Sequence, residues 1–191
     1  MAEAAELHAD LKSLRAQIEA IQRDAEELLK GMTEAQFNWR PAPNRWSVGE
    51  CLEHLNVAAR LYWPLLAATI NQARVAGVMS PGPYKHGWIG NWFVRIAEPP
   101  PRMRVPAPRR FRPQMNLPLA QVVPQFAAFQ ERLLDLLRDA NGVDLGRAKV
   151  QMPATKLVQL TLGQAFSLVA AHQRRHLWQA RQVKDEPGFP K

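Results

Sequence analysis

The sequence predicts an all-α protein, a four-helix bundle in which a long proline- and arginine-rich crossover joins the second and third helices. Four segments carry apolar residues at steps of three and four, the spacing of one face of an α-helix. Two of these segments begin with the S/T-x-x-E/Q pattern of a capping box. No segment shows the sustained polar and apolar alternation of a strand, so no sheet is expected.

Each predicted helix is long enough to span a bundle. The helices are expected over residues 3–30, 47–76, 119–140 and 161–183. A glycine and two prolines between residues 31 and 43 break the chain after the first helix. The segment 147–160, before the last helix, is expected to be irregular. We predict that His8 lies on an exposed part of the first helix.

The connection between the second and third helices, residues 77–118, holds nine of the sixteen prolines. We expect a short helix over 87–98 and an extended, partly polyproline-like stretch over 99–113. A connection of this length is usually functional or disordered. Its aromatic residues predict that part of it packs on or over the bundle; they are Tyr84, Trp88, Trp92, Phe93 and Phe111.

The composition indicates one domain, residues 1–191, with enough apolar residues (47%) to form a core. The longest apolar runs, such as residues 65–70, are too short to cross a bilayer. The N-terminal residues are acidic and lack the pattern of a secretory signal. One cysteine, Cys51, excludes an internal disulfide and is typical of a reducing compartment. We therefore expect a cytoplasmic protein with no membrane partner.

The net charge of +8 is concentrated in residues 95–112, which hold six arginines and one glutamate. This segment could bind phosphates, line the site and bind carboxylates, or form a solvated strap over outer carboxylates. It offers no helix to enter a groove and no strand aromatics on which bases could stack. We expect no sequence-specific nucleic-acid binding.

Three of the five histidines form a candidate metal site. His172 and His176 are four residues apart, so they share one face of the last helix, and that face is otherwise apolar. His54 on the second helix is suited to supply the third ligand. Three neutral imidazoles leave a position open for water or substrate, as in a catalytic zinc site. The alternatives are packing or surface histidines and an exposed basic face on the last helix.

Two further residues are candidate catalytic groups. Glu50, one turn before His54, could act as general base, although its capping-box position competes for the same carboxylate. Gln179, seven residues after His172, could hydrogen-bond a metal-bound water or a ligand imidazole, or could be a plain surface residue.

Other residues near the predicted site receive simpler interpretations. Cys51 is interpreted as a buried free cysteine rather than a ligand. Glu53 points about 100° away from His54 around the helix and is expected to be solvated. Trp63 or Trp178 could wall a pocket over the metal, while Trp39 and Trp46 are expected to pack in the core and at helix ends.

Two stretches resemble the DinB-like superfamily. They are NWRPAPNRWSVGECLEHL, residues 38–55, and LTLGQAFSLVAAHQRRHLWQARQV, residues 160–183. The resemblance implies an up-up-down-down four-helix bundle and a metal, often nickel or zinc, held at His54, His172 and His176. Related groups include the YfiT-like and maleylpyruvate-isomerase thiol-dependent transferases and metal-dependent hydrolases. The long 77–118 connection departs from compact members and leaves the substrate open.

We therefore expect a metal-dependent enzyme that activates a water or thiol nucleophile. The reaction is thiol transfer or hydrolysis on a small molecule, and a low-molecular-weight thiol is the co-substrate in the first case. The alternative is a non-catalytic binding module that holds an anionic ligand or nucleic acid through residues 95–112. A homodimer is left open.

Overall fold

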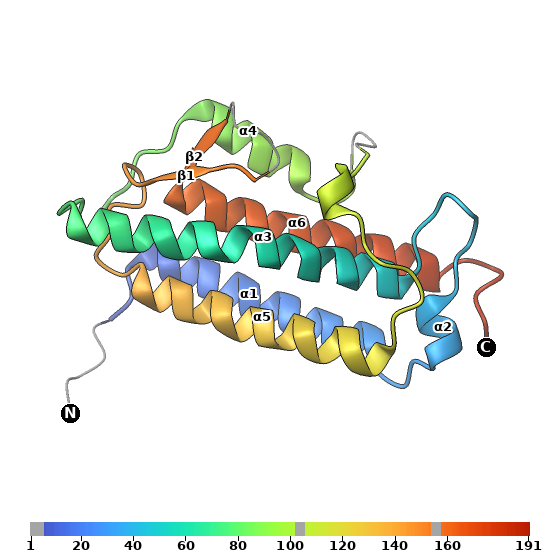
Figure 1. The fold of residues 1–191 in the computed structure, drawn as a ribbon. Helices are drawn as coiled ribbons and strands as arrows, with labels where there is room; N and C mark the ends of the chain where they lie inside the picture. The colour runs from blue at the N-terminus through green and yellow to red at the C-terminus, as the bar shows by residue number, and fades with distance from the viewer. Residues whose placement is uncertain (1–5, 102–105, 154–157) are drawn as a thin grey trace.

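Four long helices lie side by side in the computed structural model, which describes residues 6–101, 106–153 and 158–191 (Figure 1). These helices are α1 (Ala9–Leu29), α3 (Val48–Val75), α5 (Leu119–Asp139) and α6 (Leu162–Lys184). The shorter elements are α2 (Glu34–Asn38), α4 (Trp88–Ala97), the 3-10 turn η1 (Arg109–Phe111) and the strands β1 (Lys149–Gln151) and β2 (Gln159–Thr161). The chain is predominantly helical, as the sequence predicts.

Polar contacts between the long helices give their relative directions. Between α1 and α6, Gln17 pairs with Arg174, and Asp24 pairs with Arg181 seven residues further along both helices. The two helices are therefore parallel. The helices α3 and α5 are also parallel. Asn56 donates to the Val122 carbonyl, and Arg74, further along α3, donates to the Asp139 carbonyl, further along α5.

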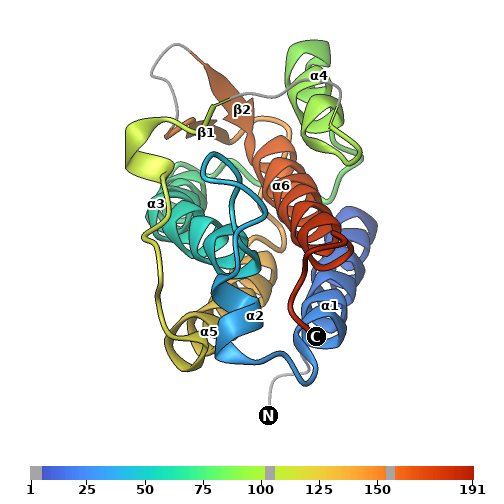
Figure 2. The ribbon, with the colours of Figure 1, turned by 90° about the vertical axis from the view of Figure 1, so that its right-hand side faces the viewer.

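The α3–α5 pair runs opposite to the α1–α6 pair, and both α1 and α3 pack against α5 and α6 (Figures 1 and 2). The order of directions along the chain is thus up, down, down, up. It differs from the up-up-down-down order that the resemblance implies. The connection over residues 30–47, which contains α2, stays at one end of the helices, so α3 begins where α1 ends and runs against it (Figure 1).

Both predicted capping boxes are present. The Ser47 hydroxyl accepts the backbone N–H of Glu50, and the Glu50 carboxylate accepts the backbone N–H of Ser47. Thr161 and Gln164 make the same reciprocal pair at the start of α6. These two boxes fix where the histidine-bearing helices begin, since each satisfies two backbone donors that the first helical turn leaves open.

The segment predicted only as a break contains α2, which begins with a third capping box, Thr33 with Gln36. The Phe37 ring of α2 is fully buried against Gly49 at the start of α3. A methyl group at Gly49 would lie 2.6 Å from the ring carbon Cε1 of Phe37. The glycine is therefore required by this close approach.

Two further predictions about local structure are wrong. The segment expected to be irregular forms the antiparallel pair β1–β2, in which buried Val150 faces buried Leu160. Three residues per strand are too few for an alternation to show in the sequence. The first helix begins at Ala9, and His8 is its N-cap, half-buried with its ring against Tyr84.

The described parts of the crossover, residues 77–101 and 106–118, pack on the outside of α6 and α3 (Figure 2). The predicted short helix is α4, which lies against α6 where Gly90 approaches Gln164 and where Glu98 pairs with Arg174. The stretch expected to be extended contains the η1 turn, and residues 102–105 of that stretch lie outside the described residues. Phe111 is buried against the helices.

The expectation that the crossover's aromatic residues pack on the bundle holds in part. Phe111 is buried, and Tyr84 and Phe93 are half-buried. Trp88 and Trp92 are 78% and 51% exposed. Among the described residues, no helix is both long and apolar enough to span a membrane.

Gly49→Ala should destabilise the protein by about 1–3 kcal/mol, because the added methyl group overlaps the Phe37 ring and a packed core resists expansion. Urea unfolding followed by circular dichroism measures the loss. Gly87→Ala is the matched control, because Gly87 also lies at a helix start and a methyl group there meets no atom within 4 Å. Equal stability of Gly49→Ala and the native protein would contradict the close approach.

Candidate metal centre

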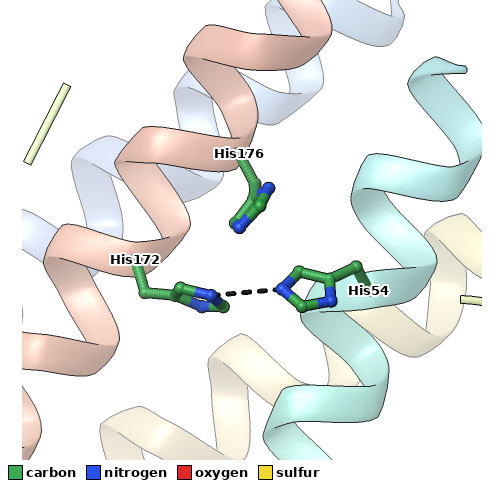
Figure 3. A group of neighbouring side chains, drawn as sticks. All are labelled: His54, His172 and His176. Carbon is green, nitrogen blue, oxygen red and sulfur yellow. Dashed lines mark hydrogen bonds between the residues drawn. The ribbon is translucent and has the colours of Figure 1, made fainter. Parts of the chain in front are cut away.

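Three imidazoles from two helices meet inside the protein (Figure 3). His54 comes from α3, one turn after its capping box, and His172 and His176 come from successive turns of α6. Their potential ligand nitrogens all lie within 4.8 Å of one another. His54 and His176 are 3% and 8% exposed. The predicted convergence of these three residues is therefore present in the structure.

The carbonyl oxygen of Phe111 fixes the tautomer of His54. The Nδ1 of His54 lies 2.6 Å from this oxygen. A carbonyl can only accept, so Nδ1 carries the proton and donates. The other nitrogen, Nε2, therefore keeps a free electron pair, and it is the nitrogen that faces the other two histidines.

Gln179 fixes the tautomer of His176 in the same way. The side-chain oxygen of Gln179 lies 3.0 Å from the Nδ1 of His176 and accepts its proton in a hydrogen bond. The Nε2 of His176 thus also retains its electron pair. The sequence suggested a bond from Gln179 to a ligand imidazole, and the structure contains it.

The spacing of the nitrogens fits a single ion. The Nε2 atoms of His54 and His172 are 3.1 Å apart. Two imidazole nitrogens that each bind one zinc ion at about 2.0–2.1 Å lie roughly 3–3.5 Å apart in tetrahedral or octahedral arrangements. The ring centroids are 4.3–5.0 Å apart across the three pairs. The three histidines therefore form a group that could hold one metal ion.

The surroundings keep all three imidazoles neutral, which metal binding requires. Burial lowers the pKa of His54 below its ordinary value, although the bond to the Phe111 carbonyl opposes the shift. Burial, together with the neighbouring His54 and Arg175, lowers the pKa of His172 to about 3. The pKa of His176 is also lowered, chiefly by burial and then by the other two histidines and Arg175.

An open cleft of about 1250 Å³ gives access to the histidines. Its walls come from the start of α3, the second half of α6 and the crossover around Phe111. Of the two tryptophans proposed to wall a pocket, Trp178 lines this cleft, whereas Trp63 is 37% exposed and stacks with Arg132 elsewhere.

Sequence reasoning missed two residues of the site. The Trp46 ring packs on both His54 and His176, with centroids 4.9 and 5.7 Å away. Its position just before the capping box was visible in the sequence and indicated only helix-end packing. Phe111 contributes a backbone carbonyl. No sequence pattern marks a carbonyl 57 residues from the histidine that it binds.

Glu50 lies in the cleft wall and is 4% exposed. Its Oε2 accepts a hydrogen bond from the Ser47 backbone N–H and forms an ion pair with Arg40, whose Nε lies 3.0 Å away. The carboxylate therefore caps α3 and also borders the site, so both roles that the sequence left open are compatible with its position.

Of two neighbours of His54 on α3, Glu53 differs from its sequence prediction and Cys51 agrees with it. Glu53 is 4% exposed and pairs with Arg60 and Asn56, so the expectation that it is solvated is wrong. The face of α3 that carries Glu53 is covered by α5, which the sequence could not reveal. Cys51 is fully buried and unbridged, as expected, and burial raises the pKa of its thiol.

Comparison with known proteins gives one match. A family model described as the DinB superfamily matches residues 17–180 of the chain. This match includes all three histidines, Glu50 and Gln179. No curated protein and no solved structure matches the chain.

The metal-free protein should lose stability as the pH falls from about 6.5 towards 5. The unfolded histidines bind protons near pH 6.5, whereas the folded ones stay neutral because their pKa values are lowered. Stability is thus fully present above pH 6.5 and declines below it, by up to about 1.4 kcal/mol per pH unit for each histidine.

Urea unfolding of the chelator-treated protein between pH 5 and 8 measures this slope. His176→Gln removes one titrating group and should flatten it, while His8→Gln, which lies outside the cluster at the N-cap of α1, should change it little. A slope that is unchanged by His176→Gln would contradict the burial of a neutral imidazole.

Proposed function

This chain belongs to the DinB superfamily, and from that premise and the histidine cluster we propose that it is a metal-dependent enzyme. It uses a divalent ion, zinc or nickel, held by His54, His172 and His176 to activate a water or thiol nucleophile. The nucleophile attacks a small-molecule substrate in the adjoining cleft. The reaction is thiol transfer or hydrolysis.

The observation that carries the proposal is the set of hydrogen bonds behind the histidines. A packing cluster of buried imidazoles would hydrogen-bond through whichever nitrogens came nearest. Here, a backbone oxygen and an amide oxygen accept hydrogen bonds from the Nδ1 atoms of His54 and His176, and the Nε2 atoms of His54 and His172 face each other. Superfamily members in general bind a metal, which supports the same reading. A divalent ion bound there would lower the pKa of a coordinated water or thiol towards neutrality.

The architecture belongs to the same proposal. We take α1, α3, α5 and α6 as one four-helix bundle within a single domain of residues 1–191. Residues 77–118 are its crossover, and residues within its described ranges 97–101 and 106–115 line one side of the cleft. The single buried cysteine is compatible with a cytoplasmic protein. We propose that it has no membrane partner and no sequence-specific nucleic-acid partner. A homodimer is the oligomer to test.

The side chains around the ion have distinct roles in this proposal. His54, His172 and His176 hold the ion, and Gln179 orients His176. Glu50 is the candidate base, because it is the carboxylate in the cleft wall nearest in sequence to His54 and borders the same open space. Its Oε2 is engaged by Ser47 and Arg40, so proton transfer would use Oε1.

If the reaction is thiol transfer, the thiol comes from a co-substrate. Cys51 is fully buried, and burial and Glu50 raise the pKa of its thiol, so it cannot supply a thiolate at neutral pH. The cleft is large enough to hold a low-molecular-weight thiol beside a second small molecule.

The experiment that tests the function is a turnover assay with zinc-loaded and nickel-loaded protein. The panel contains low-molecular-weight thiols paired with electrophiles, and hydrolysable esters and amides. The protein carries no histidine tag, so that the measured metal belongs to the site. Full metal loading without turnover across the panel would contradict the enzyme and leave a binding module for an anionic ligand.

His172→Ala should abolish metal binding and turnover while the fold remains. Alanine favours the helix and removes a buried polar group, so the metal-free protein should unfold at a similar urea concentration. Metal content by mass spectrometry, turnover and urea unfolding are the three measurements. His8→Ala is the matched control and should retain metal and activity, because His8 lies at the far N-cap of α1. Metal retained by His172→Ala would contradict the ligand set.

Glu50→Gln should lower turnover by about 10²-fold or more with unchanged metal content, because glutamine completes a capping box but accepts no proton. Glutamine already fills this position at Gln36 and Gln164. Glu53→Gln is the control: Glu53 is equally buried and pairs with an arginine, but it does not line the cleft. Equal activity of the two variants would leave Glu50 as a helix cap only.

A further inference from the structure

The histidines stand between two arms of the cleft that differ in polarity. Along α3, residues on both sides of His54 line the cleft, and along α6, residues on both sides of His172 and His176 line it. The two helices run in opposite directions, so the residues after His54 face the residues before His172 (Figure 1). This part of the cleft is the first arm. The second arm lies between the residues before His54 and those after His176.

Contacts away from the histidines confirm which segments face each other. Before His54, Arg45 pairs with Glu186, just beyond the end of α6. After His54, the Tyr62 hydroxyl donates to the sulfur of Met152. Met152 follows β1, which pairs with β2 directly before α6. Tyr62 therefore lies towards the start of α6, at the far end of the first arm.

The first arm is apolar. The described residues that α3 and α6 contribute to it are all aliphatic or aromatic, namely Leu55, Ala58, Ala59, Tyr62, Leu168 and Val169. Ala58 follows His54 by one helical turn and Tyr62 follows it by two, so the arm extends along α3 for about 12 Å from the histidine. Small alanine side chains on this wall leave space that a larger residue would fill.

The second arm is mainly polar. Its polar side chains are Arg40, Asn44, Arg45, Glu50, Gln179, Gln182 and Glu186. Both glutamates are in ion pairs, Glu50 with Arg40 and Glu186 with Arg45. An apolar group bound there would remove water from charged groups, which costs free energy, whereas a polar molecule would find hydrogen-bond partners.

The two remaining charged residues of the described cleft wall, Arg112 and Arg175, lie outside the helix segments that form the first arm. Both donate to backbone carbonyls, Arg112 to that of Ala107 and Arg175 to that of Ile96. The contrast between the arms therefore comes from the walls that α3 and α6 supply.

We propose that the substrate carries an uncharged apolar substituent, an aromatic ring or a short alkyl chain, which binds in the first arm while the reacting group lies at the three histidines. This inference rests on the proposed function, because it names the substrate class of that same site. Burial of the substituent supplies binding energy. The second arm, with Glu50 in its wall, stays open to the polar nucleophile. Ala59 is a specificity-determining residue, since its small side chain keeps the first arm open.

The test measures alkyl hydroxamates by calorimetry on zinc-loaded protein without free zinc. Hydroxamates bind zinc directly, so acetohydroxamate, butanohydroxamate and hexanohydroxamate share one anchor and differ in chain length. Each added methylene group should raise the affinity about twofold to fourfold, because it moves from water into the arm. A chain of similar length that ends in a charge, ε-aminocaproylhydroxamate, should lose most of this gain. Equal affinity of all four ligands would overturn the proposal.

Ala59→Leu separates the first arm from the metal centre. Leucine favours the helix and fills the space of the alkyl chain, so affinity for hexanohydroxamate should fall roughly tenfold. Affinities for zinc and for acetohydroxamate should stay the same, since neither reaches residue 59. Ala128→Leu, at an exposed position of α5 outside the cleft, is the matched control and should change none of them. An undiminished preference of Ala59→Leu for the long chain would overturn the proposal.

The zinc-free protein distinguishes failure of this inference from failure of the proposed function. If the chain binds no zinc, the proposed function fails, yet the first arm can still be tested with N-phenylnaphthylamine, an uncharged dye that fluoresces in apolar sites. Weaker dye binding by zinc-free Ala59→Leu than by zinc-free Ala128→Leu and the native protein would then support the apolar arm. Equal dye affinity of the three proteins would overturn it.

Discussion

The hydrogen bond from His54 to the Phe111 carbonyl is the contact on which the rest of the site depends. It fixes the proton on Nδ1 and so leaves Nε2 as the electron-pair donor towards the α6 histidines. It also ties the crossover to the bundle, since the carbonyl belongs to η1. Buried polar groups need partners, so the tautomer of His54 and the position of the crossover are determined together.

The charge around the site follows from the same packing. Burial keeps the imidazoles neutral, and two of the arginines among the described residues of the cleft walls, Arg40 and Arg45, pair with Glu50 and Glu186. Arg112 of the crossover and Arg175 of α6 line the same cleft.

Much of the fold and the site could be predicted because the signals are local. Capping boxes act within four residues, so Ser47 and Thr161 mark where α3 and α6 begin. Helical periodicity places His172 and His176 on one face, whatever the rest of the chain does. His54 was proposed as the third ligand from its helix, and the family resemblance, which the match over residues 17–180 confirms, implies the same three residues. The short α2 carried a readable capping box and was still missed within a glycine- and proline-rich segment.

The sequence by itself determined the helical class, the starts of the two histidine-bearing helices and the shared face of His172 and His176, because these depend on residues a few positions apart. Only the tertiary structure decided the direction of α3 relative to α1, the burial of Glu53 under α5, and the packing of Trp46 on His54. It also decided that a carbonyl of the crossover orients that histidine. These contacts join residues far apart in the chain, and the packing of whole helices selects them, so no local pattern encodes them.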